Sequence, residues 1–179
     1  MDFQSSKTYE NIQNSYQQEL MSSSRNSIYA FKAREQEYIE ISDIFKQTAQ
    51  HDLEHAITWL KVLNNGEIPD TESNLVSAYE NNNNLGTKLY REYADTAREE
   101  GFHEIALLFD GMANIEAGHD SLFYTLSEQV DDNGVFCREE EKLWICMKCG
   151  NIISGICAPN YCPVCGYPQG YYRIYESDH

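Results

Sequence analysis

Four of the six cysteines are arranged as two closely spaced pairs near the carboxyl end of the chain. The first pair lies in Cys146-Met147-Lys148-Cys149-Gly150 and the second, after twelve residues, in Cys162-Pro163-Val164-Cys165-Gly166. Two such turns, each followed by glycine, allow four thiolates to converge tetrahedrally, with backbone amides pointing at the sulfurs. The pattern predicts a four-cysteine metal centre of the rubredoxin or zinc-ribbon type.

The residues at this centre leave two metals open. Tetrahedral sulfur suits both a single iron and zinc. Iron would make the centre an electron carrier, whereas zinc would make it a structural clip. The nearby aromatic residues would serve equally to shield a redox site or to form the core of a small domain; they are Trp144, Tyr161, Tyr167 and the Tyr171-Tyr172 pair.

Two cysteines, Cys137 and Cys157, lie outside the pairs. We interpret each as a small apolar side chain or a free thiol rather than a metal ligand. The start of the sequence lacks the basic and apolar regions of a signal peptide, and no apolar stretch approaches the ~20 residues of a membrane helix. We therefore expect a cytoplasmic protein, in which paired cysteines bind metal rather than form disulfides.

The charge of the chain excludes one broad class of partner. Thirteen basic and twenty-nine acidic residues give a formal net charge of −16. Such a chain repels polyanions and anionic membrane surfaces. We expect no nucleic-acid partner and no membrane partner.

A helical region extends from about Thr8 to Val130. It is rich in helix-forming residues, and its apolar side chains recur with a period near 3.6 residues. Breaks are predicted near Glu37, between Asn64 and Asp70, and at Gly101. The sequence thus predicts four long helices in an all-α four-helix bundle over residues 1–134, followed by a small metal domain over residues 135–179.

Ionisable side chains interrupt the apolar stripes of three of these helices. The fourth helix carries Glu116 and His119, the second carries Asp52 and His55 at the same spacing, and the first adds Glu19. Residues three apart share one helical face and can bind one metal ion. Unpaired burial of these groups would cost several kcal/mol, and a metal is the simplest compensation. We predict all five as metal ligands and catalytic residues.

The third helix offers no comparable ligands. Its inward positions are Asn82 and Leu85, an amide and a hydrocarbon. The nearest carboxylate, Glu80, lies about 200° around the helix from Asn82, at ~100° per residue. This helix therefore contributes at most one weak ligand.

From about Glu10 to Glu176 the sequence resembles the rubrerythrins, non-haem iron proteins that join a ferritin-like di-iron bundle to a rubredoxin-like centre. The stretches that carry the resemblance are Ile41-Ser42-Asp43-Ile44-Phe45, Glu54-His55-Ala56, Ala97-Arg98-Glu99-Glu100-Gly101-Phe102, Glu116-Ala117-Gly118-His119 and the paired-cysteine segment. The combination of both halves is more specific than either motif alone.

The resemblance implies a peroxidase-type oxidoreductase that reduces hydrogen peroxide under oxidative stress. It favours iron at the four cysteines and one or two irons in the bundle, although zinc also fits either site. Electrons would come from an NAD(P)H-linked reductase or a rubredoxin-type donor and would pass through the cysteine-bound iron to the bundle. The resemblance also implies a homodimer.

Position by position, Glu19 matches the first-helix carboxylate of the family, His55 the second-helix histidine, and Glu116 with His119 the fourth-helix pair. Asp52 stands where the family has a glutamate. These matches imply one well-ligated site from Glu19, Asp52, His55 and Glu116, and a weaker second site at His119.

Two further positions depart from the family pattern, since Asn82 and Leu85 stand where the family has glutamates. Tyr90 matches a tyrosine near the family's metal site. The departures imply slow or absent peroxidase activity. The alternatives are a non-peroxidase relative that works in electron transfer, redox sensing or iron binding, and a zinc-clipped structural adaptor.

Overall fold

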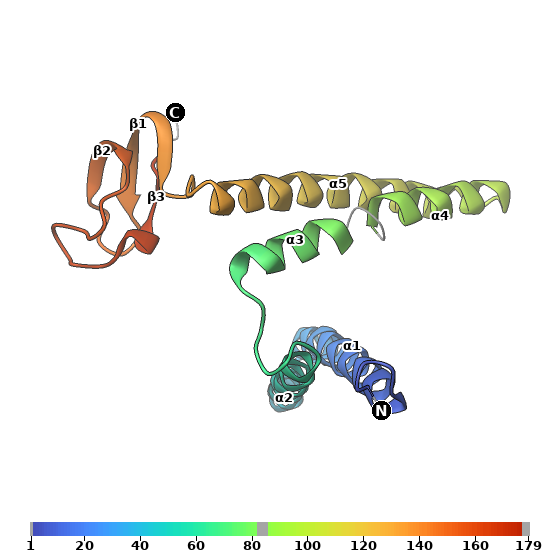
Figure 1. The fold of residues 1–179 in the computed structure, drawn as a ribbon. Helices are drawn as coiled ribbons and strands as arrows, with labels where there is room; N and C mark the ends of the chain where they lie inside the picture. Colours follow the sequence, from blue (N-terminus) through green and yellow to red (C-terminus); the bar gives the residue numbers. More distant parts are fainter. Residues whose placement is uncertain (1, 82–85, 177–179) are drawn as a thin grey trace. The chain divides into compact units, whose positions relative to one another are not determined.

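The computed structural model describes residues 2–81 and 86–176 (Figure 1). The chain divides at Pro69 and Asp70 into two compact units. The first unit is purely helical, and the second contains helices followed by a small sheet. No helix among the described residues is both long and apolar enough to cross a membrane.

The first unit is a hairpin of two long helices, α1 (Lys7–Glu35) and α2 (Ile39–Leu63). The predicted break at Glu37 is confirmed, and this residue adopts a φ of 64° in the turn. Small buried residues let the two backbones approach closely, so that hydroxyl groups reach across to carbonyls. Ser42 Oγ donates to the Ala30 oxygen and Ser23 Oγ to the Ala49 oxygen, both at 2.8 Å.

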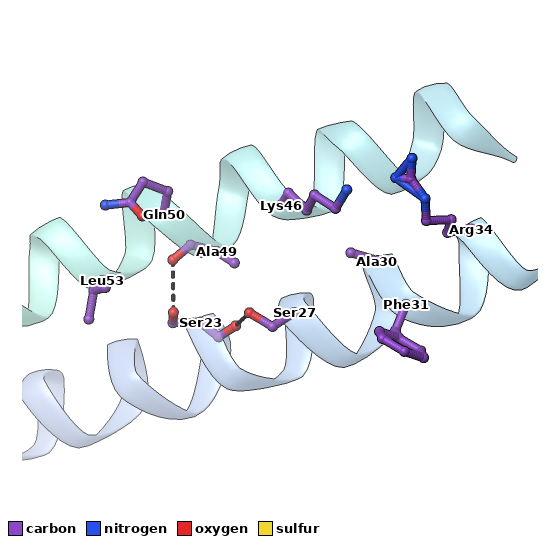
Figure 2. Close-up of a pocket in the computed structure, with 9 residues that line it drawn as sticks. All are labelled: Ser23, Ser27, Ala30, Phe31, Arg34, Lys46, Ala49, Gln50 and Leu53. Carbon is purple, nitrogen blue, oxygen red and sulfur yellow. Dashed lines mark hydrogen bonds between the residues drawn. The ribbon is translucent and has the colours of Figure 1, made fainter. Parts of the chain in front are cut away.

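One side of this hairpin carries an open groove (Figure 2). Its lining consists of Ser23, Ser27, Ala30, Phe31, Arg34, Lys46, Ala49, Gln50 and Leu53. Phe31 is 81% exposed at its edge. The groove is therefore a partly apolar surface between α1 and α2 that the hairpin itself leaves uncovered.

The second unit begins with three helices, α3 (Thr71–Asn81), α4 (Lys88–Glu99) and α5 (His103–Asp131). Asp70 caps α3, because its Oδ1 accepts the Ser73 N–H at 2.9 Å, and this bond lowers the pKa of Asp70. The break at Gly101 is confirmed, with a φ of +85°. Both α3 and α4 contact α5.

The single third helix predicted from the sequence is thus described as two helices. Gly86 and Thr87 form a π-helical turn directly before α4. Such turns insert an extra residue into the helical ladder and shift the faces that follow it. The positions Asn82 and Leu85 lie outside the described residues.

The apolar stripe of α5 was expected to be buried, but several of its large residues are exposed. Leu108 is 66% exposed, Ile115 54% and Leu122 53%. The buried residues of α5 are instead the small ones, including Ala106 and Ala113. Phe109 of the same stripe packs against Tyr93 of α4, with ring centroids 5.6 Å apart, so α3 and α4 cover only part of the stripe.

After α5 the chain forms a three-stranded antiparallel sheet of β1 (Cys137–Cys146), β2 (Ile152–Cys157) and β3 (Tyr172–Ile174), in the order β2-β1-β3. A 3₁₀ turn at Gln169–Tyr171 leads into β3. The domain has its own core, made of Trp144, Cys146, Ala158, Cys162 and Tyr172. The predicted fold class, a helical part followed by a small metal-type domain, is confirmed.

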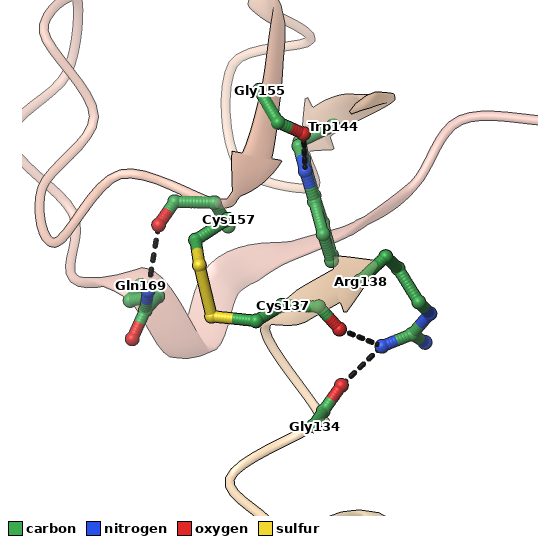
Figure 3. The surroundings of a disulfide bond; sticks show 8 residues. Gly134, Cys137, Arg138, Trp144, Gly155, Cys157 and Gln169 are labelled. Atoms are coloured by element: carbon green, nitrogen blue, oxygen red, sulfur yellow. Dashed lines mark hydrogen bonds between the residues drawn. A yellow bond between two sulfur atoms is a disulfide. The ribbon is translucent and has the colours of Figure 1, made fainter. Parts of the chain in front are cut away.

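The prediction that Cys137 and Cys157 are free thiols or apolar fillers is wrong, since the two form a disulfide (Figure 3). The register of the sheet explains the pairing, because Cys137 on β1 lies directly opposite Cys157 on β2. The two cysteines are 20 residues apart in the sequence, and no local sequence motif connects them. Their pairing could therefore not be predicted from the sequence.

Candidate metal centres

The four paired cysteines come together at one end of the sheet. Each pair forms a tight turn closed by the following glycine: the Gly150 N–H donates to the Cys146 oxygen and the Gly166 N–H to the Cys162 oxygen, both at 2.8 Å. Both glycines have positive φ, +77° and +73°. Such a φ strains other residues, so the glycine after each pair is a requirement of the turn.

The sulfur positions fit a tetrahedral metal ion. Cys146 Sγ lies 3.7 Å from Cys165 Sγ, and Cys149 Sγ lies 3.6 Å from Cys162 Sγ. All four sulfurs lie within 4.8 Å of one another. A metal with sulfur bonds of about 2.3 Å requires sulfur separations of about 3.8 Å in a tetrahedron. Cys149 is exposed whereas Cys146 and Cys162 are buried, so one side of the centre faces solvent.

The pKa values of these thiols diverge. Interaction with the Tyr172 hydroxyl is the main influence that lowers the pKa of Cys162 to about 6. For Cys165, the hydrogen bond from the Tyr167 N–H lowers the pKa. Burial and the thiols of Cys149, Cys162 and Cys146 outweigh this effect and raise the pKa of Cys165 to about 12. Four thiolates this close repel one another and need a cation to ionise together, which a metal ion supplies.

Tyr172 is the aromatic residue most closely coupled to the centre. It is only 3% exposed, and burial raises the pKa of Tyr172 to about 12, which keeps its hydroxyl protonated. The hydroxyl makes no hydrogen bond of ordinary geometry among the described residues. Trp144, 1% exposed, completes the shield, whereas Tyr161 is 68% exposed and does not contribute to it.

In the helical hairpin, the predicted residues Glu19, Asp52 and His55 do come together. Their candidate ligand atoms lie within 4.8 Å of one another, and His55 Nδ1 is 3.4 Å from Glu19 Oε2. Glu19 is on α1 and the other two are on α2, so the register of the hairpin brings them side by side. Two carboxylates and an imidazole form a donor set that suits iron or zinc.

Two residues that the sequence reasoning missed hold Asp52 in place. Ser22 Oγ donates to Asp52 Oδ2 at 2.7 Å, and Asn26 Nδ2 donates to the same oxygen at 2.9 Å. Both hydrogen bonds go to Oδ2 and neither goes to Oδ1. Together they hold the Asp52 carboxylate in one orientation. Both residues follow Glu19 at helical spacings of three and seven, which was the available signal.

On α5, Glu116 and His119 also form the predicted pair, with Glu116 Oε2 3.3 Å from His119 Nδ1. Gly86, which the sequence reasoning did not single out, packs against this pair: a Cβ on Gly86 would lie 3.0 Å from Glu116 Cβ and Cγ. Thr87 Oγ1 donates to Asp120 Oδ2 at 3.4 Å, which joins the start of α4 to the same turn of α5.

The candidate ligands on the helices are more exposed than the sequence led us to expect. The His55 side chain is 59% exposed and that of His119 50%, although Glu19 and Glu116 are less than one-third exposed. Tyr90, on α4, packs near Phe109 with ring centroids 6.0 Å apart. The family positions Asn82 and Leu85 lie outside the described residues.

Comparison with known proteins found a family model, curated relatives and solved structures that are similar to this chain. The sequence model of the family described as Rubrerythrin matches residues 73–145. Rubrerythrin-1 of Clostridium acetobutylicum is 33% identical over 97% of this chain and 96% of its own length, and a rubrerythrin of Clostridium perfringens is 35% identical over 95% of each. A solved structure of nigerythrin in a mixed-valence state is 23% identical, covers 93% of this chain and 85% of its own, and has a TM-score of 0.35.

Proposed function

The chain belongs to the rubrerythrin family, and on that premise we propose that it is an oxidoreductase that reduces hydrogen peroxide. Membership of the family supports a non-haem iron redox protein. The observation that carries the proposal is the coexistence of two kinds of site in one chain: four thiols with the separations of a tetrahedral metal, and carboxylate–imidazole groups on helices.

The four-cysteine centre is proposed to hold one iron and to act as the electron port. Its exposed Cys149 gives a donor protein access to one sulfur, while Cys146 and Cys162 keep the opposite side dry. The donor is proposed to be a rubredoxin-type protein or an NAD(P)H-linked reductase. The acidic surface expected from a net charge of −16 favours a donor with a basic docking face.

The helical residues are proposed to hold one or two irons. Ferritin-like di-iron proteins combine glutamates with Glu-x-x-His pairs, and Asp52 to His55 and Glu116 to His119 have that spacing. Glu19 adds a further carboxylate. Bound iron would supply electrons to the O–O bond of peroxide, and this reduction consumes two protons and two electrons to give two waters. The contacts at 3.3 and 3.4 Å place one carboxylate beside one imidazole in each proposed ligand group.

We further propose that turnover is slow, because Asn82 and Leu85 replace carboxylate ligands of the family, and that the protein works as a cytoplasmic homodimer. Exposed apolar side chains on α5, such as Leu107 at 69% and Leu108 at 66%, support assembly with further helices. Sedimentation of the iron-loaded protein tests the dimer directly.

The test of the activity is peroxide-dependent oxidation of the reduced, iron-loaded protein, followed through the visible absorption of the four-thiolate iron. We expect slow oxidation in the native chain and a clear acceleration in the double variant Asn82→Glu with Leu85→Glu. The variant Gln13→Glu with Asn14→Glu adds the same charge at exposed positions of α1 and should leave the rate unchanged.

Two outcomes would contradict the proposal. A colourless protein that retains zinc after native production would point to the structural adaptor. A red protein that peroxide fails to oxidise, in both the native chain and the double variant, would leave an electron-transfer or iron-binding role.

A further inference from the structure

The Cys137–Cys157 disulfide lies outside both candidate metal sites, and nothing in the proposed function uses it. Cys157 is exposed and Cys137 is partly exposed. A thiolate from solvent can therefore reach at least the Cys157 sulfur. Where thiols are kept reduced, disulfides are usually transient, catalytic or redox-sensing, and exposed ones are the most labile.

The disulfide joins the two ends of the β1–β2 hairpin that carries the first metal-binding turn. β1 runs from Cys137 to Cys146, and β2 ends at Cys157. Cys146 and Cys149 thus lie within the loop of 20 residues that the disulfide closes. The residue after the disulfide, Ala158, is 3% exposed and packs in the same core as Cys146 and Cys162.

The sheet is irregular at this point, and few regular residue pairs join β1 to β2 near the disulfide. The disulfide therefore supports the pairing of the two strands here. Cys137 pairs with Cys157, and the next regular pair is Lys142 with Gly155. Cys137 and Lys142 are five residues apart on β1, whereas their partners Cys157 and Gly155 are two residues apart on β2. The residues of β1 between them are therefore unpaired. Gly155 fits tightly here, because a Cβ would lie 3.0 Å from the Cys157 oxygen.

Non-covalent contacts connect the same junction to the metal domain (Figure 3). The Arg138 guanidinium donates to the oxygens of Gly134 and Cys137, and it lies 5.7 Å from the centre of the Trp144 ring. The Ala158 N–H donates to the Phe136 oxygen at 2.8 Å. These contacts keep the two cysteines adjacent when the covalent bond is open, which is what a reversible site needs.

We propose that Cys137 and Cys157 form a reversible dithiol–disulfide site, and that its oxidised form clamps the hairpin that holds Cys146 and Cys149. The co-reactant class is a dithiol, supplied by a small molecule or a protein. The clamp slows the loss of metal from the four-cysteine centre. This inference concerns the chemistry of sulfur and stands independently of peroxide reduction.

The exchange balances in two steps. A thiolate of the dithiol attacks Cys157 Sγ, the Cys137–Cys157 bond breaks, and Cys137 leaves as a thiolate that takes up a proton. The second thiol of the reagent, as its thiolate, then attacks the mixed disulfide and expels the Cys157 thiolate, which is protonated in turn. The reagent is oxidised to its disulfide by two electrons, and the protein gains two thiols.

The experiment uses the full-length, metal-loaded protein in buffers of stepped ratios of reduced to oxidised dithiothreitol. Thiols are trapped with N-ethylmaleimide, and labelled peptides are identified by mass spectrometry. We expect no label on Cys137 or Cys157 in the oxidised buffer, both labelled in the reduced buffer without denaturant, and a return to the unlabelled state when the ratio is reversed.

A second measurement follows the transfer of metal to a coloured chelator. The rate should rise about ten-fold on reduction, a change of the size that residues supporting metal ligands usually produce. The double variant Cys137→Ser with Cys157→Ser should be equally fast before any reductant is added. Its rate with and without dithiothreitol gives the direct effect of the reagent, which is subtracted.

Three results would overturn the inference. Label on both cysteines in the oxidised buffer would show that the bond does not form. Label that appears only after denaturation would show a purely structural disulfide. Equal metal-transfer rates in the oxidised protein, the reduced protein and the double variant would show that the bond does not clamp the centre.

Discussion

The cysteine centre and the helical ligand groups are built in opposite ways. The four cysteines lie within 20 residues of one another, and two glycine-closed turns with a small sheet suffice to bring their sulfurs together. The candidate ligands on the helices span about one hundred positions: within the first unit Glu19 lies with Asp52 and His55, and within the second Glu116 lies beside His119. The cysteine site depends on local turns, whereas the group of Glu19, Asp52 and His55 depends on packing between α1 and α2.

Burial reflects this difference. The cysteine domain encloses its own core, with Trp144 and Cys146 at 1% and 0% exposure, whereas His55 and His119 are at least half exposed. A site with its own core should tolerate changes elsewhere in the chain. A site on exposed helix faces should respond to any change that alters helix packing.

The largest effect is expected from Cys162→Ser. Removal of one buried thiolate breaks the tetrahedral set, and metal binding in small thiolate domains supplies about 10 kcal/mol or more of folding free energy. Metal analysis should show the cysteine centre empty of metal, while the helical content measured by circular dichroism is preserved. Val164→Ala, at an exposed position between the same cysteines, is the control. Retention of metal by Cys162→Ser would contradict the conclusion that the site needs all four of these neighbouring cysteines.

A smaller loss, confined to the helices, is expected from His55→Ala. Removal of an imidazole ligand should weaken metal binding there by about 100-fold, at the upper end of what supporting residues cause, and leave the cysteine centre loaded. Calorimetric titration with ferrous iron would measure both sites. His51→Ala, one turn earlier and exposed, should change neither. Equal loss in the two variants would remove His55 from the ligand set.

A weaker effect is expected from Asn26→Ala, because Asp52 keeps its bond from Ser22. Loss of one orienting hydrogen bond should lower iron affinity in the hairpin by about ten-fold. The same titration measures it. Ser27→Ala is the matched control, since Ser27 Oγ donates to the Ser23 carbonyl of its own helix. An unchanged affinity in Asn26→Ala would indicate that Asp52 does not bind metal.

The smallest effect is expected from Tyr172→Phe. The pKa of Cys162 is lowered from its usual value near 9 to about 6, and the Tyr172 hydroxyl is the largest cause, so the variant should raise this pKa. The lowered pKa of Cys162 favours the folded, metal-free state above pH 9, and this contribution is lost as the pH falls through 6. Alkylation rates of the metal-free protein against pH would show the shift. Tyr171→Phe should leave the midpoint in place, and an identical midpoint in Tyr172→Phe would contradict the assignment.

What could be predicted from the sequence follows the same division. The cysteine turns were predictable because every determinant lies within a few residues, down to the glycines with positive φ. The helix ends near Glu37 and Gly101 were predictable for the same reason. The pairing of Cys137 with Cys157 was not, because it depends on the register between two strands.

The helical part shows a second limit. Periodicity correctly indicated which residues share a face, and the Glu116–His119 and Asp52–His55 groups follow from it. It did not indicate what covers that face, so the exposure of Leu108 and Ile115 was missed. Periodicity also did not indicate the π-helical turn at Gly86 and Thr87, because such a turn leaves no signature in the spacing of apolar residues.

The close approach of Gly86 to Glu116 limits the conformations of this candidate ligand. A single methyl group at position 86 would meet the side chain of Glu116 at 3.0 Å, so either the carboxylate would rotate to another rotamer or the start of α4 would move outward. The direction in which Glu116 points is therefore compatible with glycine at position 86 and would be strained by a larger residue. In a helical site of this kind, the size of the residue beside a candidate ligand therefore matters as well as the identity of the candidate ligand.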